Sequence, residues 1–157
     1  GAGIVVDRKI HAGINKIAGE FGHHTVSFQN GRPCWCGSKG CVETYVSGSG
    51  IEAQYLRKTG NRDNAKNILS SSCEEAYNLK QEFYEVLGVS LGNVCNILDP
   101  EIIVMGGGLS NYDPLYTEVR KQIQKYTFSD TFNTAFVKNR LGDSAGVIGA
   151  AMLPACL

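Results

Sequence analysis

The stretch that decides the fold begins with Glu20-Phe21-Gly22-His23 and ends with Cys34-Trp35-Cys36-Gly37-Ser38-Lys39-Gly40-Cys41-Val42-Glu43. Its three cysteines follow the spacing C-x-C-x4-C and a histidine precedes them, so the stretch offers one imidazole nitrogen and three thiolates. Structural zinc sites are tetrahedral and take four nitrogen or sulfur ligands, which leaves no position for water. The stretch therefore predicts a structural zinc site whose ligands are His23, Cys34, Cys36 and Cys41.

Two glycines between the second and third cysteines support this interpretation. At Gly37 and Gly40 the backbone must fold back tightly, and glycine reaches positive φ without steric cost. The alternatives are a disulfide or free thiols, together with a histidine that is simply packed or at the surface. Cys34 and Cys36 are too near in sequence to pair easily with each other. Zinc remains the preferred interpretation, because one histidine and three cysteines together make one complete set of four zinc ligands.

Two glutamates bracket the expected ligands. Glu20 lies three residues before His23, and Glu43 lies two residues after Cys41. If zinc fixes the backbone on either side, both carboxylates are held in place and suit the recognition of neighbouring hydroxyls on a polyol. The competing interpretation makes Glu20 a solvated turn residue and Glu43 a helix-start residue favoured by the helix dipole. On these residues alone the competing interpretation is preferred.

Length and charge limit the classes of protein that fit. A chain of 157 residues fits one domain that buries roughly two-thirds of its unfolded surface. Fifteen basic and fifteen acidic residues balance, so no overall field attracts nucleic acid or an anionic membrane. The sequence has neither a membrane-spanning apolar run nor a signal-peptide pattern. Cys73, Cys95 and Cys156 are scattered through helix-like segments, which favours the reducing cytoplasm over secretion.

Hydrophobic periodicity predicts alternating strands and helices. The longest periodic run is a helix over residues 74–98, in which Gly88 and Gly92 imply close packing against another element. Asp113-Pro114 is expected to begin a helix with Leu115, Val119, Ile123 and Tyr126 on one face. Strands are predicted at residues 4–7, 9–11, 24–28, 101–105 (a buried strand) and 134–138, and further helices at 44–47, 49–58, 65–69 and 145–155.

A second glycine-rich turn follows the predicted strand at residues 101–105. Gly106-Gly107-Gly108 lies between this strand and a helix start, a layout that lets backbone amides approach a phosphate or nucleotide. The alternative is a tight turn with no ligand.

Three segments resemble the ROK family (repressors, open reading frames, kinases), which contains bacterial and animal sugar kinases and related sugar-responsive repressors. They are Gly19-Glu20-Phe21-Gly22-His23, the segment from Cys34 to Thr44, and Gly106-Gly107-Gly108-Leu109-Ser110. The resemblance runs from Gly1 to about Pro154 and looks closest to bacterial fructokinases and N-acetylhexosamine kinases. It implies an α/β fold, the C-terminal lobe of a two-lobed actin-like (ribonuclease-H-like) sugar kinase with a zinc-binding loop.

The resemblance also implies the roles of particular residues. The zinc ligands are the same four side chains, and Glu20, His23 and Glu43 would contact the sugar, with His23 using both ring nitrogens. The glycines near the nucleotide would be Gly1, Gly3, Gly106, Gly107 and Gly108. No catalytic residue is expected in this chain, because residues 1–157 correspond to the C-terminal lobe and the general base belongs to the N-terminal lobe. The implied cofactors are structural Zn²⁺, with ATP and Mg²⁺ in the full-length enzyme, and the chain alone is expected to be inactive.

The expected reaction of the full-length protein is ATP-dependent phosphorylation of a hexose or N-acetylhexosamine, usually on the 6-hydroxyl. A homo-oligomer is also expected, as is usual for kinases of the family. One alternative is a repressor of the same family, which would carry an upstream helix-turn-helix and bind nucleic acid. The segment Thr44-Tyr45-Val46-Ser47-Gly48-Ser49-Gly50 looks more like the kinase branch. The second alternative is a zinc-stapled interaction domain without a sugar site.

Overall fold

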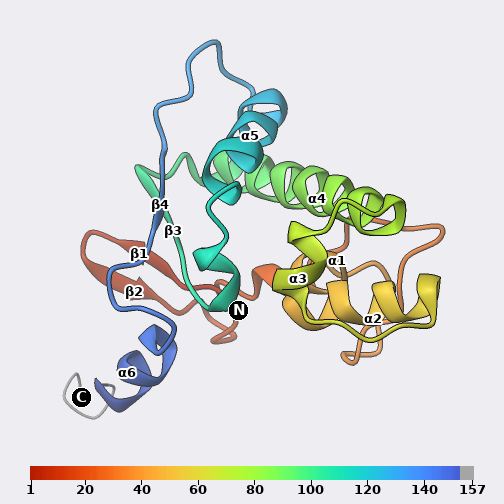
Figure 1. The fold of residues 1–157 in the computed structure, drawn as a ribbon. Coiled ribbons are helices and arrows are strands. Elements are labelled where there is room, and N and C mark those ends of the chain that lie inside the picture. The colour runs from red at the N-terminus through yellow and green to blue at the C-terminus, as the bar shows by residue number, and fades with distance from the viewer. Residues whose placement is uncertain (153–157) are drawn as a thin grey trace.

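The computed structural model describes residues 1–152, in which helices pack around one long helix and two small sheets lie beside them (Figure 1). The chain begins with β1 (Ile4–Val6), β2 (Lys9–His11) and the 3-10 helix η1 (Phe21–His23). Then follow α1 (Glu43–Val46), α2 (Gly48–Thr59), α3 (Ala65–Ser70), α4 (Glu74–Leu98) and β3 (Ile102–Met105). The remaining elements are η2 (Gly108–Asn111), η3 (Leu115–Val119), α5 (Arg120–Tyr126), β4 (Ala135–Lys138) and α6 (Ala145–Met152).

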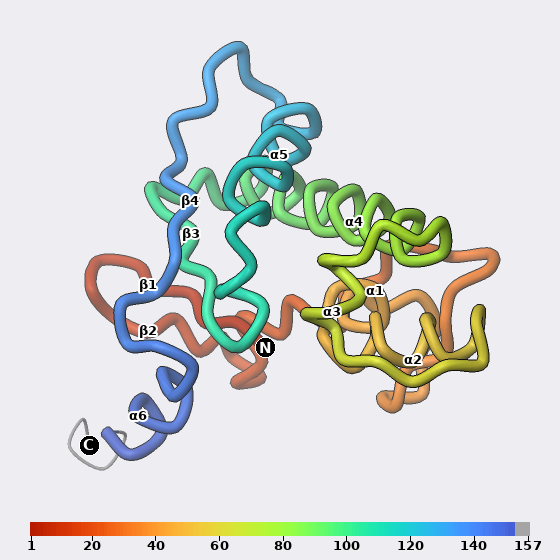
Figure 2. The backbone as a smooth tube through the Cα atoms, in the orientation of Figure 1, coloured from red at the N-terminus to blue at the C-terminus, as the bar shows by residue number. Residues whose placement is uncertain are grey.

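Helix α4 is the centre of the core. Its buried positions recur at steps of three and four residues, as the sequence predicts: Ala76, Leu79, Phe83, Leu87 and Leu91. Figure 2 shows α1, α2 and α3 beside the N-terminal half of α4 and α5 beside its C-terminal half, and all four helices contact it. Burial of this apolar face is therefore what holds the two halves of the chain together.

The two glycines of α4 face α5. A Cβ atom on Gly88 would overlap the Cβ atom of Gln122, and one on Gly92 would lie 2.8 Å from the Cβ atom of Tyr126. Contacts this short are excluded by van der Waals repulsion, so only glycine permits the observed approach of the two helices. The predicted close packing is confirmed, and α5 is the partner.

Helix ends follow the capping rules. The Ser47 hydroxyl accepts a hydrogen bond from the Gly50 amide (3.0 Å) at the start of α2, and Gly60 ends this helix with φ of 74°. The helix expected after Asp113-Pro114 differs in its first turn, because η3 is a π-helical turn that leads into α5. The expected N-terminal cap at this position is not formed by a side chain.

The two sheets have two strands each in the described chain. The two predicted strands β1 and β2 form an antiparallel hairpin, with Ile4 opposite His11, while β3 and β4 run parallel, with Ile102 opposite Ala135. The prediction of a buried strand at residues 101–105 is wrong in one respect. Ile102 and Val104 are 52% and 54% exposed, because only the alternate face of β3, with Ile103, packs on the core.

The strand predicted at residues 24–28 is not formed. Only Thr25 pairs, in an isolated antiparallel bridge with Cys41, and Phe28 is 89% exposed. The physical reason is the return of the cysteine loop across this segment. A Cβ atom on Gly40 would overlap the carbonyl oxygen of Ser27, so the two backbones meet at one point and do not run alongside each other.

Helix α6 covers residues 145–152 of the helix predicted at 145–155, and residues 153–155 lie outside the described part of the chain. Figure 1 shows α6 apart from the helices around α4, and none of its residues is buried. Among the described residues there is no helix whose length and apolar character would allow it to cross a membrane.

Candidate metal centre

The candidate metal ligands come from two backbone turns. His23 is the last residue of η1, and the cysteines lie on a loop that returns to the chain just before α1. The loop closes through hydrogen bonds from the Cys34 amide to the Ser38 carbonyl (2.9 Å) and from the Gly37 amide to the Cys34 carbonyl (3.1 Å). Gly37 and Gly40 have φ angles of 90° and 77°, which confirms the predicted need for glycine there.

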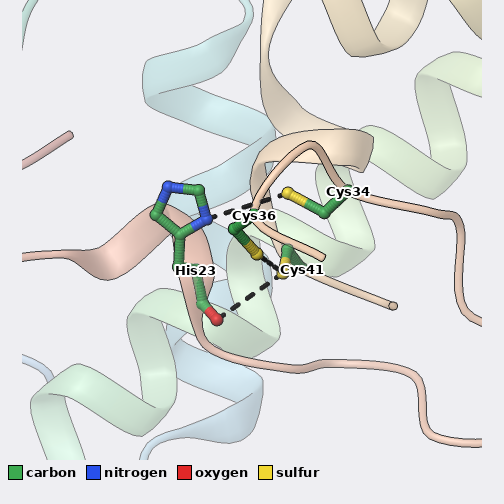
Figure 3. A group of neighbouring side chains, drawn as sticks. All are labelled: His23, Cys34, Cys36 and Cys41. Atoms are coloured by element: carbon green, nitrogen blue, oxygen red, sulfur yellow. Dashed lines mark hydrogen bonds between the residues drawn. The ribbon is translucent and has the colours of Figure 1, made fainter. Parts of the chain in front are cut away.

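The four side chains converge, as Figure 3 shows, and their ligand atoms all lie within 4.8 Å of one another. His23 Nδ1 is 3.8 Å from Cys34 Sγ, and Cys36 Sγ is 3.7 Å from Cys41 Sγ. A tetrahedral zinc ion with Zn–S bonds of about 2.3 Å requires sulfur atoms about 3.8 Å apart. The donor atoms therefore fit a zinc ion with little movement.

A disulfide is excluded among the described cysteines. Cys34, Cys36, Cys41, Cys73 and Cys95 are all free thiols, and Cys156 lies outside the described residues. The first alternative to a metal, a disulfide inside the C-x-C-x4-C segment, is therefore not observed.

The three thiols of the cluster have different proton affinities. A hydrogen bond from the Ser38 backbone lowers the pKa of Cys36 to about 6. Burial raises the pKa of Cys41. At Cys34 the backbone N–H of Cys36 acts to lower the pKa, but burial and the hydrogen bond to Glu43 outweigh it and raise the pKa to about 12. Cys36 is the thiol most readily available as a thiolate.

Glu43 lies directly beside the cluster. Its Oε1 atom is 3.0 Å from Cys34 Sγ and 3.8 Å from His23 Nδ1. Gly22 packs against the same side chain, since a Cβ atom there would lie 3.3 Å from the Cβ atom of Glu43. Glu43 does begin α1, as the competing interpretation held, but its carboxylate also faces the histidine.

Glu20 lies at the start of η1, with its side chain exposed. Its carbonyl accepts a hydrogen bond from the His23 amide (3.1 Å), so the two residues are joined by one tight turn. The N-terminal glycines lie close by, because the Ala2 amide donates to the Gly19 carbonyl (3.0 Å). The structure thus brings Gly1 and Gly3 near the turn that carries Glu20.

The glycine triplet lies in the other half of the chain. Gly106, Gly107 and Gly108 have no atom within 4 Å of the place where a Cβ atom would stand, so their backbone is open to approach. The Ser110 hydroxyl donates to the Gly107 carbonyl (2.7 Å), which fixes the turn. The element that follows is the 3-10 turn η2, so the structure supplies no long helix start at this point.

Two residues of the metal segment were not predicted to matter. The ring of Trp35 meets the ring of His23 edge to face, with centroids 5.1 Å apart, and 82% of Trp35 is exposed. Arg32 is largely buried and is bonded to α1, to α4 and to the returning side of the cysteine loop. Trp35 carried a weak signal in its position between two ligands, whereas Arg32 has partners distant in sequence and carried none.

Comparison with known proteins gives one consistent family. Residues 1–155 match the profile of the ROK family. An N-acetyl-D-glucosamine kinase of Vibrio cholerae is 37% identical over 165 residues, covering 98% of this chain and 55% of that protein. A ROK family glucokinase of Streptomyces griseus, solved with glucose and AMPPNP, has a TM-score of 0.82 at 25% identity, covering 96% of this chain and 55% of the other.

A ROK family transcriptional regulator, a homologue of the E. coli MLC protein, has a TM-score of 0.72 at 24% identity, covering 87% of this chain and 38% of the regulator. The fold is thus α/β and of the actin-like ATPase type found in ROK sugar kinases, as expected. The chain spans about half the length of the curated relatives it matches. On this match of profile, sequence and fold, the chain belongs to the ROK family.

Proposed function

We propose that the protein containing this chain transfers a phosphoryl group from ATP to a hexose or N-acetylhexosamine, with the 6-hydroxyl as the expected acceptor. The observation that carries the proposal is the Glu43 carboxylate beside His23 and the cysteine cluster. The relative from Vibrio cholerae is named an N-acetyl-D-glucosamine kinase, which favours an amino sugar among the candidate substrates. The candidates remain fructose, glucose, mannose and the N-acetylhexosamines.

A structural zinc ion fits the cluster, and His23, Cys34, Cys36 and Cys41 would hold it. Zinc would supply no chemistry to the reaction, because four protein ligands close its coordination sphere. Its role would be to fix the ring of His23. Nδ1 is directed at the thiols and Nε2 points away from them (Figure 3), so with zinc on Nδ1 the Nε2 atom would carry the proton and could donate it to a sugar hydroxyl.

The two glutamates would accept hydrogen bonds from neighbouring hydroxyls of the sugar. Glu20 precedes the turn that ends at His23, and Glu43 lies beside Nδ1 of the same ring, so the three groups would contact the sugar from one small region of the chain. Such contacts contribute to the rate because they orient the reacting hydroxyl toward the γ-phosphate. ATP would supply the phosphoryl group, and Mg²⁺ would neutralise the charge on it.

We also propose which parts of the kinase site this chain supplies and which part lies elsewhere in the whole protein. Residues 1–157 would form the C-terminal lobe, with the metal segment at residues 20–43 and a nucleotide-side glycine turn at residues 106–110. Gly1, Gly3 and the triplet Gly106–Gly108 would offer backbone amides to the nucleotide. The general base would lie outside these 157 residues, so the chain alone is expected to show no ATP turnover above background.

The proposal is tested by Glu43→Ala in the full-length protein. The expected result is a rise in the sugar KM of roughly tenfold or more, the loss expected for a hydrogen bond to a charged group, with little change in the ATP KM. Glu118→Ala on η3, an exposed glutamate paired with Lys121, is the matched control. Equal effects on both KM values would show that Glu43 serves only to begin α1.

The regulator among the structural neighbours keeps a repressor function open as the second candidate. Specific DNA binding by the full-length protein that a hexose reverses, without phosphorylation of that hexose, would favour it. If no hexose raises the melting temperature of the full-length protein, the remaining interpretation is an interaction domain stapled by zinc.

A further inference from the structure

Arg32 connects the cysteine loop to two helices. It lies two residues before Cys34, and only 11% of its side chain is exposed. Its Nη1 donates to the Thr44 carbonyl of α1 (3.0 Å), and its Nη2 donates to the carboxylate of Glu82 on α4. The guanidinium also stacks on the ring of Tyr45, with Cζ 4.0 Å from the ring centroid.

The backbone of Arg32 is engaged as well. Its amide donates to the Tyr45 hydroxyl (3.3 Å), and its carbonyl accepts from the Gly40 amide (2.8 Å), one residue before the ligand Cys41. One residue thus bonds to the returning side of the loop, to α1 and to α4. We call Arg32, Tyr45 and Glu82 the Arg32 clamp.

The clamp acts on the element that carries Glu43. Helix α1 has four residues, and a helix this short is not stable in water without tertiary contacts. Its direction must therefore come from tertiary contacts, and the bond from Arg32 to Thr44 adjoins Glu43 directly. We propose that Arg32, with Glu82 as its counter-charge, is a positioning residue that holds the Glu43 carboxylate beside His23.

Arginine suits this task for a physical reason. Its planar guanidinium donates in two fixed directions at once and stacks on an aromatic ring, which the single ammonium of lysine does not reproduce. Glu82 is partly exposed, so its charge is tolerated at the surface, while the buried end of the pair is the arginine. Glu82→Gln would therefore weaken the hold on the guanidinium and leave its largely buried positive charge without a counter-charge.

The first experiment measures zinc content and amide hydrogen exchange of the chain. In Arg32→Lys and Glu82→Gln, one zinc per chain should remain, and the amides of α1 should exchange roughly two- to tenfold faster, the factor that a hydrogen bond of ordinary strength supplies. The amides of α2 and the core of α4 should not change. Glu118→Gln, which breaks an exposed pair with Lys121, should leave every rate unchanged.

The second experiment rests on the proposed kinase function and uses the full-length protein. Arg32→Lys should raise the sugar KM by roughly the same two- to tenfold and leave the ATP KM unchanged. Arg32→Ala should raise the sugar KM more than Arg32→Lys does. Millimolar guanidinium added to Arg32→Ala should then restore part of the sugar affinity. This recovery is not expected if Arg32 serves only to keep the loop folded.

The outcomes separate the two proposals. Unchanged α1 exchange in Arg32→Lys, or loss of zinc from it, overturns the positioning role, and so does an equal rise of both KM values. If the unaltered protein phosphorylates no hexose, the proposed function fails, and the exchange rates alone decide whether the clamp holds α1.

Discussion

Single residues determine how the candidate metal ligands meet. Gly40 has positive φ, and its backbone passes so close to the Ser27 carbonyl that no side chain fits there. Gly37 also has positive φ, but it has open space around it. The two glycines are therefore required for different reasons, one for conformation and contact together and the other for conformation alone.

The residue-scale prediction for the metal concerns its ligands. Protein purified without added metal should contain nearly one zinc per chain, and Cys36→Ala should lose it and melt at a lower temperature, because structural zinc contributes directly to folding. Cys73→Ser is the control, since Cys73 is exposed and outside the cluster. Metal analysis and calorimetry make the measurement. Retention of zinc by Cys36→Ala would remove this cysteine from the ligand set.

Proton release gives a second prediction at this scale. Zinc binds thiolates, and the pKa values of Cys34 and Cys41 are raised, whereas that of Cys36 is lowered to about 6. Near pH 7.5 zinc binding should therefore release about two protons, and the apparent affinity should fall as the pH falls, by about a hundredfold per pH unit. Titration calorimetry in buffers of different ionisation enthalpy counts the protons. An affinity independent of pH would contradict the assignment.

Helix packing supplies the prediction at the scale of elements. Gly88→Ala should destabilise the chain by about 1–3 kcal/mol, because the new methyl group forces α4 and α5 apart. Gly146→Ala in α6 is the matched control, because nothing lies near its missing Cβ atom and alanine favours a helix by up to ~1 kcal/mol. Urea unfolding of both variants gives the comparison. Equal stability of the two variants would mean that α5 moves to make room for the methyl group without a loss of unfolding free energy.

The same elements show what the sequence can predict. Helices α2 and α4 have strong periodicity and clear ends, so their bounds agree with expectation within a residue or two. The strand predicted at residues 24–28 fails because its pairing depends on the path of the cysteine loop, which local pattern does not contain. The exposed face of β3 was missed because an apolar run does not reveal whether one or both faces are covered.

The candidate site divides in the same way. The convergence of the four candidate metal ligands was predictable, since all four lie in one short segment with a recognisable donor set. Arg32 was not, because its partner Glu82 lies fifty residues further along the chain and an isolated arginine carries no pattern. The contact of Glu43 with His23 depends on how α1 packs beside η1, which no local sequence pattern contains.

At the scale of the whole molecule, apolar surface predicts association. Apolar side chains are exposed on the hairpin (Val5, Ile10), on β3 (Ile102, Val104) and on α6 (Val147, Met152). Surfaces of this kind bind one another in water, so the chain should form dimers or larger species at micromolar concentration. Light scattering provides the measurement, and Ile10→Lys with Val147→Lys should reduce the apparent mass. A stable monomer at high micromolar concentration would contradict the expectation.

The short span of the metal segment has a consequence for the order of events during biosynthesis. All four ligands are present once the ribosome has added Cys41, whereas the core also needs Phe136 on β4. At 5–20 residues per second, the intervening stretch takes roughly 5–20 s to translate. Zinc bound by these residues would therefore close the loop on the nascent chain well before α4 and α5 are complete. The long helix would then fold onto a segment that is already ordered, which lowers the entropy still to be lost.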